Sequence, residues 1–456
     1  MISFFAAIIV LIVGYLIYGK FVERVFGIDD SLKTPAIEMQ DGVDYVPMNW
    51  KKIFLIQFLN IAGLGPIFGA IQGALFGPAA FLWIVFGTIF AGGVHDYLSG
   101  VISMKHDGTS VSEIVGIYLG DGMKKVMRVF SVILLILVGT VFVTSPAGLL
   151  TSMTGIDKNI WVVLIIIYYI VATVLPVDKV IGKIYPIFGA SLLFMAIGLA
   201  GAMIIGHFNG SMVMPEMTLQ NLHPSGLSIF PFLFTTIACG ALSGFHSTQS
   251  PMMARCINRE SESKRVFYGA MVVEGIVALI WCAVTIAFFG ESGVIQSALD
   301  SFGGQSGVVS HISKELLGPI GAVLAVLGVV ACPITSGDTA FRSARLTIAD
   351  AFNIKQDGLL SRFKLAIPLF AVCVFLTTID FNIIWRYFAW SNQTLATIFL
   401  WTATVYLIKN EANYWISLIP ATFMSSVCVS YILQAPEGFR LNAMFSNGVG
   451  VVAAIV

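Results

Sequence analysis

Runs of about 20 apolar residues recur along almost the whole chain, and this recurrence restricts the possible folds more than any other feature. Each run is long enough to cross a hydrocarbon core of about 30 Å as an α-helix. Only 11% of the 456 residues are charged, whereas soluble domains average roughly 25%. The mean hydropathy of +0.90 agrees with this. The sequence therefore predicts an all-α polytopic membrane protein.

We expect thirteen transmembrane helices, and the Lys and Arg residues support this count because cytoplasmic loops carry most of them. With the N-terminus outside, 21 of the 25 Lys and Arg residues fall in inside loops. One span more or fewer would invert every later loop. We expect a multi-pass protein of the plasma (inner) membrane with this orientation. The expected spans are approximately 2–25, 53–77, 79–103, 129–151, 160–176, 180–207, 229–250, 267–290, 317–340, 363–379, 383–408, 413–433 and 441–456.

Several function classes lack their sequence signals. The chain carries no nucleotide-binding loop and no loop that could hold an ATPase, so energy for pumping must come from a gradient. It has no HExxH-type metal pair, serine nucleophile motif or clustered carboxylates, which argues against an enzyme. The six cysteines lie in or beside apolar runs without metal-ligand spacing and read as core residues. The first run lacks a basic leader and is expected to be a retained span rather than a signal peptide. We expect no nucleic-acid partner.

Two spans are interrupted by small residues at matching positions. The second span reads "IAGLGPIFG" from Ile61, and the seventh reads "IACGALSGFHS" from Ile237. They are five positions apart in the order of the spans, so they cross in opposite directions, as in a five-plus-five inverted repeat. Paired interruptions of this kind indicate a transporter binding site. The predicted organisation is an extra N-terminal helix with its loop at 1–52, repeats at 53–207 and 229–408, an extracellular loop at 208–228, and two C-terminal helices at 409–456.

Pro66 explains how the second span could open, because proline removes a backbone donor and clashes one turn earlier, which frees carbonyls near Ala62. In lipid, such groups are tolerated only where protein or a polar cavity satisfies them. An alternative remains for the glycines at four-residue spacing, which also form a smooth face for helix packing. The interruption and the packing face can both be present, since the glycines lie at or after the position where the helix is expected to be interrupted. The stripe comprises Gly65, Gly69, Gly73 and Gly77.

Five strings, in order along most of the chain, resemble the carbon starvation A family: "IAGLGP", "FAGGVHDYLSGVISMKHDGTSVSEIVG", "FPFLFTTIACGALSGFHS", "GDTAFRSAR" and "WSNQTLATI". The resemblance implies a LeuT-like fold and transport of peptides or, in some members, pyruvate. The chain departs from the family in two ways. Many members carry a His-His pair where this chain has Ile56 and Gln57, and many have a longer C-terminal region.

Ionisable residues inside spans cost at least about 2.5–3.5 kcal/mol each on insertion scales, so each one requires a reason. His95 and Asp96 lie late in the third span, and Glu274 lies deep in the eighth, its repeat mate. We assign these three to proton coupling or gating. The alternatives are a hydrated interfacial pair for His95 and Asp96, and a structural hydrogen bond to a neighbouring helix for Glu274.

The ninth span offers oxygen ligands after Pro333, which suit a hard cation. In LeuT-like transporters a sodium site lies between the helices that correspond here to the second and ninth spans. The resemblance thus implies a Na⁺ site at Ala62, Thr335 and Ser336, with Asp338 nearby, and Na⁺ is the candidate coupling ion. Alternatively, Asp338 forms an ion pair with Arg342 one turn later.

These features predict a secondary active transporter that imports a short peptide, amino acid or pyruvate by alternating access, driven by Na⁺ or H⁺. The alternative is a membrane channel or receptor without active coupling. Two further segments, 111–127 and 295–315, are expected to lie on the cytoplasmic and external surfaces. Thr144 and Ser145 are expected to satisfy local backbone. The predicted substrate-binding residues are Asn60, Ala62, Gly63, Gly65, Thr236, Cys239, Gly240, Ser243, His246 and Asn392.

Overall fold

The structure is a computed structural model that describes residues 1–42, 44–173, 177–352, 354, 356 and 358–455, with backbone only for 177–186. The described residues are helical, and the only extended pairing among them is an isolated bridge between Met48 and Ile257. The side chains of Lys179 and Lys183, which the charge count assigned to an inside loop, fall outside the described part.

The helices of the first half alternate long spans with short kinked pieces. They are α1 (Ile2–Phe26), α2 (Pro35–Glu38), α3 (Trp50–Ala62), α4 (Gly65–Gly73), the 3-10 segment η1 (Ala74–Ala79), α5 (Ala80–Leu82), the π-segment η2 (Trp83–Gly92), α6 (Gly93–Lys105), α7 (Val111–Leu119), α8 (Asp121–Thr154), α9 (Lys158–Ala172) and α10 (Val177–Phe208).

The second half begins with another interrupted helix and ends with three apolar helices. Its elements are η3 (Ile229–Leu233), α11 (Phe234–Thr236), α12 (Gly244–Ala254), η4 (Glu260–Glu262), η5 (Lys264–Tyr268), α13 (Gly269–Phe289), α14 (Ser292–Ser301), α15 (Gln305–Ala325), η6 (Val326–Ala331), α16 (Cys332–Ala351), α17 (Leu359–Leu376), α18 (Phe381–Lys409), α19 (Trp415–Gln434) and α20 (Ala443–Ile455).

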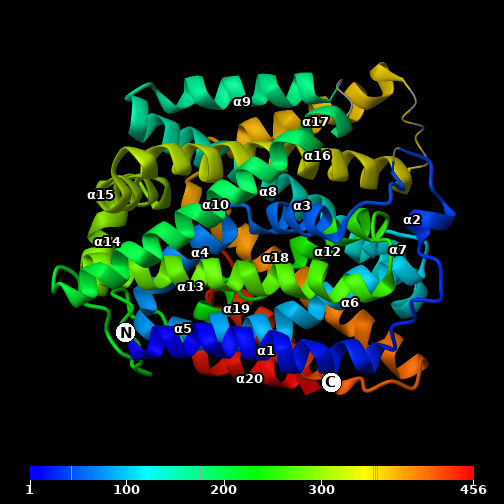
Figure 1. The fold of residues 1–456 in the computed structure, drawn as a ribbon, viewed down its shortest axis with the longest axis horizontal. Coiled ribbons are helices and arrows are strands. Elements are labelled where there is room, and N and C mark those ends of the chain that lie inside the picture. The colour runs from blue at the N-terminus through cyan, green and yellow to red at the C-terminus, as the bar shows by residue number, and fades with distance from the viewer. Residues whose placement is uncertain (43, 174–176, 353, 355, 357, 456) are drawn as a thin grey trace.

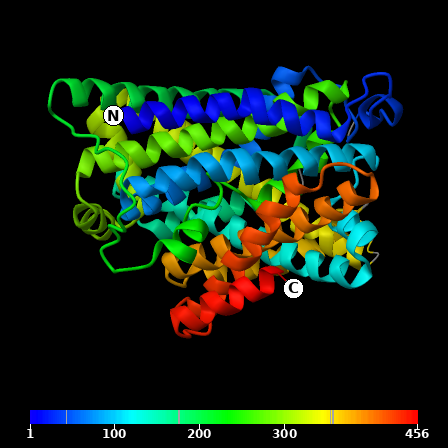
Figure 2. The ribbon, with the colours of Figure 1, turned by 90° about the horizontal axis from the view of Figure 1, so that it is seen from below.

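The long helices run along one common direction, with α2 and α7 at one end of the molecule and α14 at the other (Figure 1). Helices α1 and α20 overlap in that view but lie on opposite sides of the molecule when it is turned (Figure 2). Helix α1 packs against α13 and η2, whereas α20 packs on α19. The outer helices expose large apolar side chains along their length, as lipid-facing helices do.

Eight helices among the described residues are long and apolar enough to span a membrane, and two shorter ones, α9 and α20, are apolar as well. Two halves of the interrupted spans, α3 and α12, are absent from this set because they have only 13 and 11 residues, whereas α4 is counted with the helix that continues to Lys105. The multi-pass helical architecture is confirmed. The count of thirteen, the division into repeats and the domain limits stay predictions.

Both predicted interruptions are present. Helix α3 ends at Ala62 and α4 begins at Gly65, with Gly63 at φ −2° and ψ −126°, which is not helical. The break in the seventh span covers 237–243, between α11 and α12. Pro66 lies in the first turn of α4, where its missing N–H costs no helical hydrogen bond.

The glycine stripe of α4 faces the break of the other half. A methyl group added at Gly65 would overlap the Cys239 side chain, and one at Gly73 would overlap Ile237. At Gly69 it would lie 3.1 Å from the carbonyl oxygen of Thr236. The packing role of these glycines is therefore confirmed. Gly77 is different: with φ 74° it lies in the turn that leads to α5, and its place in the stripe was predicted wrongly.

At the end of the molecule where α2 and α7 lie, residues 257–260 are bonded to the loop that follows α1 and to the end of α6. Thr34 donates a hydrogen bond to the carbonyl oxygen of Ile257 over 2.6 Å, and Asn258 donates to the carbonyl oxygen of Met48 over 2.8 Å. Lys105, at the end of α6, pairs with Glu260 over 2.6 Å. The expected surface segments are found only in part. Residues 111–127 form α7 and the first turns of α8 at this end, and 295–315 is divided between α14 at the other end and the mostly buried start of α15. The membrane side of each segment stays a prediction.

Candidate functional site

The break in the seventh span places a histidine against two acidic residues in the protein interior. His246 lies in the first turn of α12, and its Nδ1 is 2.8 Å from Oδ2 of Asp96 on α6. The other oxygen of the same carboxylate, Oδ1, is 2.8 Å from Nδ1 of His95. All three side chains are fully buried. One carboxylate therefore joins two imidazoles, and the hydrated interfacial reading of His95 and Asp96 is wrong.

Glu274 extends this arrangement to a third helix. Its Oε2 lies 3.4 Å from Nε2 of His246, and neither carboxylate oxygen has a hydrogen-bond partner among the described residues. Glu274 is also fully buried. We refer to His95, Asp96, His246 and Glu274 as the buried quartet. It crosses from α6 through α12 to α13.

The buried quartet can hold a variable number of protons. Two carboxylates and two imidazoles in a dry interior cannot all be charged without a large desolvation penalty, so protons are shared within the group. Imidazole carries nitrogens on both edges, and a proton accepted at one nitrogen can leave from the other. His246 presents one ring nitrogen to Asp96 and the other to Glu274. This geometry suits transfer of a proton between the two acids.

The start of α12, next to His246, is fixed by Asn392 on α18. Its Oδ1 accepts hydrogen bonds from the backbone N–H of Phe245 over 2.7 Å and from the Ser243 hydroxyl over 3.2 Å. Its Nδ2 lies 3.4 Å from Cys239 Sγ. A side-chain oxygen at this place caps the helix, because the first backbone N–H groups have no partner within the helix. Sequence reasoning placed these residues together but missed that Asn392 caps α12.

The predicted substrate-binding residues of the two breaks meet in the interior. Asn60 and Ala62 are buried, and a methyl group at Gly63 would lie 2.7 Å from the ring of Phe142. A methyl at Gly240 would lie 2.5 Å from Ala278 and 3.7 Å from the Pro66 Cα. The breaks thus touch along Gly65–Cys239 and Pro66–Gly240. Their role in binding a solute stays a prediction.

The predicted sodium ligands are only partly free. The Thr335 hydroxyl donates to the carbonyl oxygen of Cys332 over 2.8 Å, whereas the Ser336 hydroxyl is buried without a described partner. Asp338 pairs with Arg342 over 3.6 Å, as the alternative reading expected. Cys332 Sγ lies 3.9 Å from the carbonyl oxygen of Leu59, so α16 touches α3 one turn before Ala62.

Two polar features escaped sequence reasoning. Gln57, at the family's histidine position, is fully buried, and neither amide atom has a partner among the described residues. Its place in the apolar string "FLIQFLN" was the available signal.

One turn after Asp96 on α6, the hydroxyls of Ser99 and Ser250 hydrogen-bond over 2.9 Å and tie α6 to α12. Thr144 and Ser145 were expected to bond to the nearby backbone. The Thr144 hydroxyl donates to the carbonyl oxygen of Thr140, but the Ser145 hydroxyl has no hydrogen-bond partner among the described residues.

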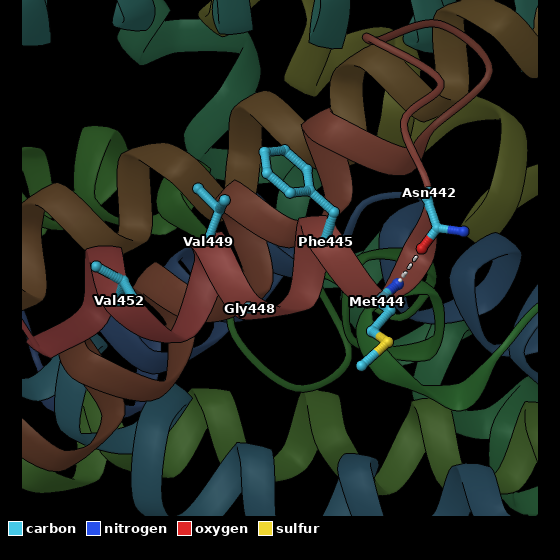
Figure 3. Close-up of a pocket in the computed structure, with 6 residues that line it drawn as sticks. All are labelled: Asn442, Met444, Phe445, Gly448, Val449 and Val452. Carbon is cyan, nitrogen blue, oxygen red and sulfur yellow. Dashed lines mark hydrogen bonds between the residues drawn. The ribbon is translucent and has the colours of Figure 1, made fainter.

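An apolar hollow lies on the surface of α20, apart from the buried quartet (Figure 3). Phe445, Val449 and Val452 line it, and Asn442 accepts a hydrogen bond from the backbone N–H of Met444 over 2.8 Å. With its one polar side chain already bonded to the backbone, this surface suits lipid chains rather than a polar solute.

The sequence model of the family Carbon starvation protein CstA matches residues 1–153 and 143–320. The chain belongs to this family. A membrane protein of Haemophilus influenzae is 44% identical over 66% of this chain and 95% of its own length. The peptide transporter CstA of Campylobacter jejuni is 27% identical, with 99% of this chain and 82% of the relative aligned. The pyruvate/proton symporter BtsT of Escherichia coli is 26% identical over 63% of this chain and 49% of its own length.

The CstA-family chain shares its fold with solved transporters. A Na⁺-coupled sialic acid symporter superposes with a TM-score of 0.57 at 14% identity, over 99% of this chain and 95% of the symporter. The CstA and BtsT relatives and the sialic acid symporter are named as transporters, not as enzymes. This CstA-family protein is therefore a multi-pass membrane transporter with a LeuT-like fold.

Proposed function

We propose that this CstA-family transporter imports a small organic solute that bears a carboxylate, across the inner membrane, and that a proton gradient drives import. The observation that carries the proposal is the buried quartet, which places four titratable groups against the broken helix α12. An intramembrane ionisable cluster without a structural need marks a proton or ion path. The names of two relatives, a peptide transporter and a pyruvate/proton symporter, support it.

The proton and the solute would be coupled through α12. His246 sits on the first turn of this helix and bonds to α6 through Asp96, so the charge of the quartet sets how tightly α12 is held. The N-terminal end of a half-helix carries a positive dipole that suits a carboxylate. A solute bound at the break and a proton bound at the quartet would therefore act on the same short element. Solute and proton would then each bind one conformation of the transporter more tightly than the other, as alternating access requires.

Uptake into proteoliposomes tests the proposal. Labelled L-alanyl-L-alanine and labelled pyruvate would be offered under an imposed pH gradient, acidic outside, and separately under a Na⁺ gradient. One pH unit is worth about 1.4 kcal/mol, so one proton per solute allows accumulation up to about tenfold. We expect saturable accumulation that a protonophore abolishes. Non-saturating flux that ignores both gradients would contradict the proposal and favour a channel.

Na⁺ is the second candidate coupling ion. Its support is the buried Ser336 hydroxyl on α16, one turn after Cys332, whose Sγ contacts a carbonyl oxygen of α3, since Na⁺ prefers oxygen ligands. The double variant Thr335→Ala plus Ser336→Ala should abolish any Na⁺ dependence of uptake and leave proton dependence in place. An unchanged response to Na⁺ would reject the site at Ala62, Thr335, Ser336 and Asp338.

A further inference from the structure

A polar pocket of about 310 Å³ lies toward the end of the molecule that is expected to face outside. It is built by α4, α8, α9, α14, α15 and α18, so both halves of the chain contribute. Its size is at the lower limit of ligand pockets, which suits a small solute. The residues that matter below are Gln72, Ser145, Lys158, Asp300, Gln305 and Asp380.

The pocket continues the path to the break in the second span. Gln72 follows Gly65 by two turns of α4, and a helix rises 1.5 Å per residue, so it lies about 10 Å outward from the break. Phe381 lines the pocket, and its ring lies 6.3 Å from that of Phe68, which is fully buried on α4. Aromatic rings thus separate the pocket from the break.

The charges in the pocket favour one class of solute. Lys158 is half-buried and has no direct ion pair or hydrogen bond among the described residues, and its electrostatic neighbour is Asp380 of the same pocket. Two carboxylates share the pocket: Asp300 accepts a hydrogen bond from Gln296 over 3.1 Å, and Asp380 accepts one from the backbone of Asn382 over 3.0 Å. One cation and two anions give a net charge of −1. A solute with both a carboxylate and an ammonium group complements this set, whereas a simple anion is opposed by it.

Two buried polar atoms lack the partners that such a solute would supply. Gln305 is 1% exposed and its Nε2 has no partner among the described residues, and Ser145, 2% exposed, has an unpartnered Oγ. Both line the pocket. An unsatisfied buried donor costs about 1–3 kcal/mol. A carboxylate or peptide carbonyl oxygen in the pocket would accept from both groups.

We infer that this pocket is an external binding site for a zwitterionic solute, an amino acid or short peptide, which it holds before the solute reaches the broken helices. The inference rests on the proposed import function and narrows its substrate class. Lys158 binds the solute carboxylate, Asp300 and Asp380 bind the ammonium group, and Gln305 and Ser145 donate to the solute's carbonyl oxygens. Pyruvate, which has no ammonium group, is disfavoured.

Protection of an engineered thiol tests the site without any transport. Asn382 is exposed, lines the pocket and uses only its backbone N–H in bonding. The variant Asn382→Cys in intact cells would be labelled with a membrane-impermeant maleimide, since the six native cysteines are buried. L-alanyl-L-alanine at ten times its dissociation constant leaves about one site in ten free, so labelling should slow about tenfold. Pyruvate at the same concentration should slow it little.

Two variants make the test specific. In Asn382→Cys combined with Lys158→Ala, protection by the dipeptide should be lost. In Lys314→Cys, at an exposed position of α15 outside the pocket, the dipeptide should leave labelling unchanged. Absence of protection at Asn382→Cys, equal protection by pyruvate, or a site that reacts only after permeabilisation would each overturn the inference.

The result separates this inference from the proposed function. Saturable, proton-driven uptake of the dipeptide without protection at Asn382→Cys overturns the external site alone. Protection without gradient-driven uptake supports the site and contradicts coupled import.

Discussion

The two helix breaks of this transporter differ in chemistry. The first is short, lies between α3 and α4, and is bordered by glycines that pack closely on the other half of the chain. The second covers 237–243, is capped by Asn392, and leads directly into His246 of the buried quartet. The first break brings backbone close to backbone, and the second brings in titratable and hydrogen-bonding side chains. Two interruptions at matching positions of the chain thus differ in the groups that they bring into the interior.

We expect the largest effect from a substitution that removes the Asp96 carboxylate, which links α6 to His246 just after the second break. Asp96→Asn keeps the size of the side chain but cannot gain or lose a proton between His95 and His246. Groups that transfer protons typically contribute ~10²–10⁴-fold to rate, so we expect proton-driven uptake to fall at least about 100-fold. The measurement is initial uptake of labelled dipeptide under a pH gradient.

A second measurement separates loss of coupling from loss of folding. Solute exchange at equal pH moves no net proton, and in Asp96→Asn it should persist. Glu315→Gln removes an exposed carboxylate of α15 and should leave both activities unchanged. If Asp96→Asn still accumulates solute against a gradient, the quartet does not carry the coupling proton, and the contrast between the breaks fails.

A pair of glycine variants compares the packing of the breaks. An added methyl at Gly244 would overlap backbone atoms of α18, at Asn392 and Ala396, which cannot rotate away. At Gly69 it would meet the Thr236 carbonyl oxygen at 3.1 Å, which a small shift relieves. Overpacking costs typically about 1–3 kcal/mol. We expect Gly244→Ala to lower the melting temperature in detergent far more than Gly69→Ala, and similar values for both would refute the asymmetry.

Removing the cap of α12 should have an intermediate effect. Asn392→Ala leaves the N–H of Phe245 without its acceptor and leaves the Ser243 hydroxyl with only the Cys239 sulfur as a partner. A buried donor left unpaired costs about 1–3 kcal/mol, which corresponds to roughly 5- to 150-fold if it falls on the solute-bound state. Asn392→Asp keeps an acceptor oxygen and should restore part of the loss. The half-saturating dipeptide concentration and the melting temperature, measured together, show which state carries the cost.

The multi-pass helical architecture, both helix breaks and the ionisable residues of the buried quartet on α6 and α13 could be predicted because each rests on local signals. Apolar length defines a span, and glycine or proline at mid-span defines an interruption. His95, Asp96 and Glu274 stood out because charge is rare in such runs. The sequence also placed Asn392 and Ser243 at one site.

The pairings themselves could not be predicted, because they depend on how distant helices pack. Asp96 and His246 lie 150 residues apart in the sequence, and no feature of the residues around either one indicates that their side chains bond. For the same reason His246 was predicted to contact the solute or a gate rather than Asp96, and Asn392 was not recognised as a cap. The outer pocket was missed because Lys158 and Asp380 resemble ordinary loop charges in the sequence, and only the fold brings the starts of α9 and α18 to one pocket.

The smallest expected effect concerns Pro66, the residue that first suggested a broken helix. The chain leaves helical geometry at Gly63, before the proline, and α4 starts at Gly65, so Pro66 initiates a helix rather than ending one. Proline at a compatible position stabilises by only about 0.4–1 kcal/mol, chiefly through the unfolded chain. Pro66→Ala should therefore lower the melting temperature slightly and change dipeptide uptake by less than about twofold. A loss as large as that of Asp96→Asn would mean that the proline, and not the glycine contact with Cys239, keeps the first break open.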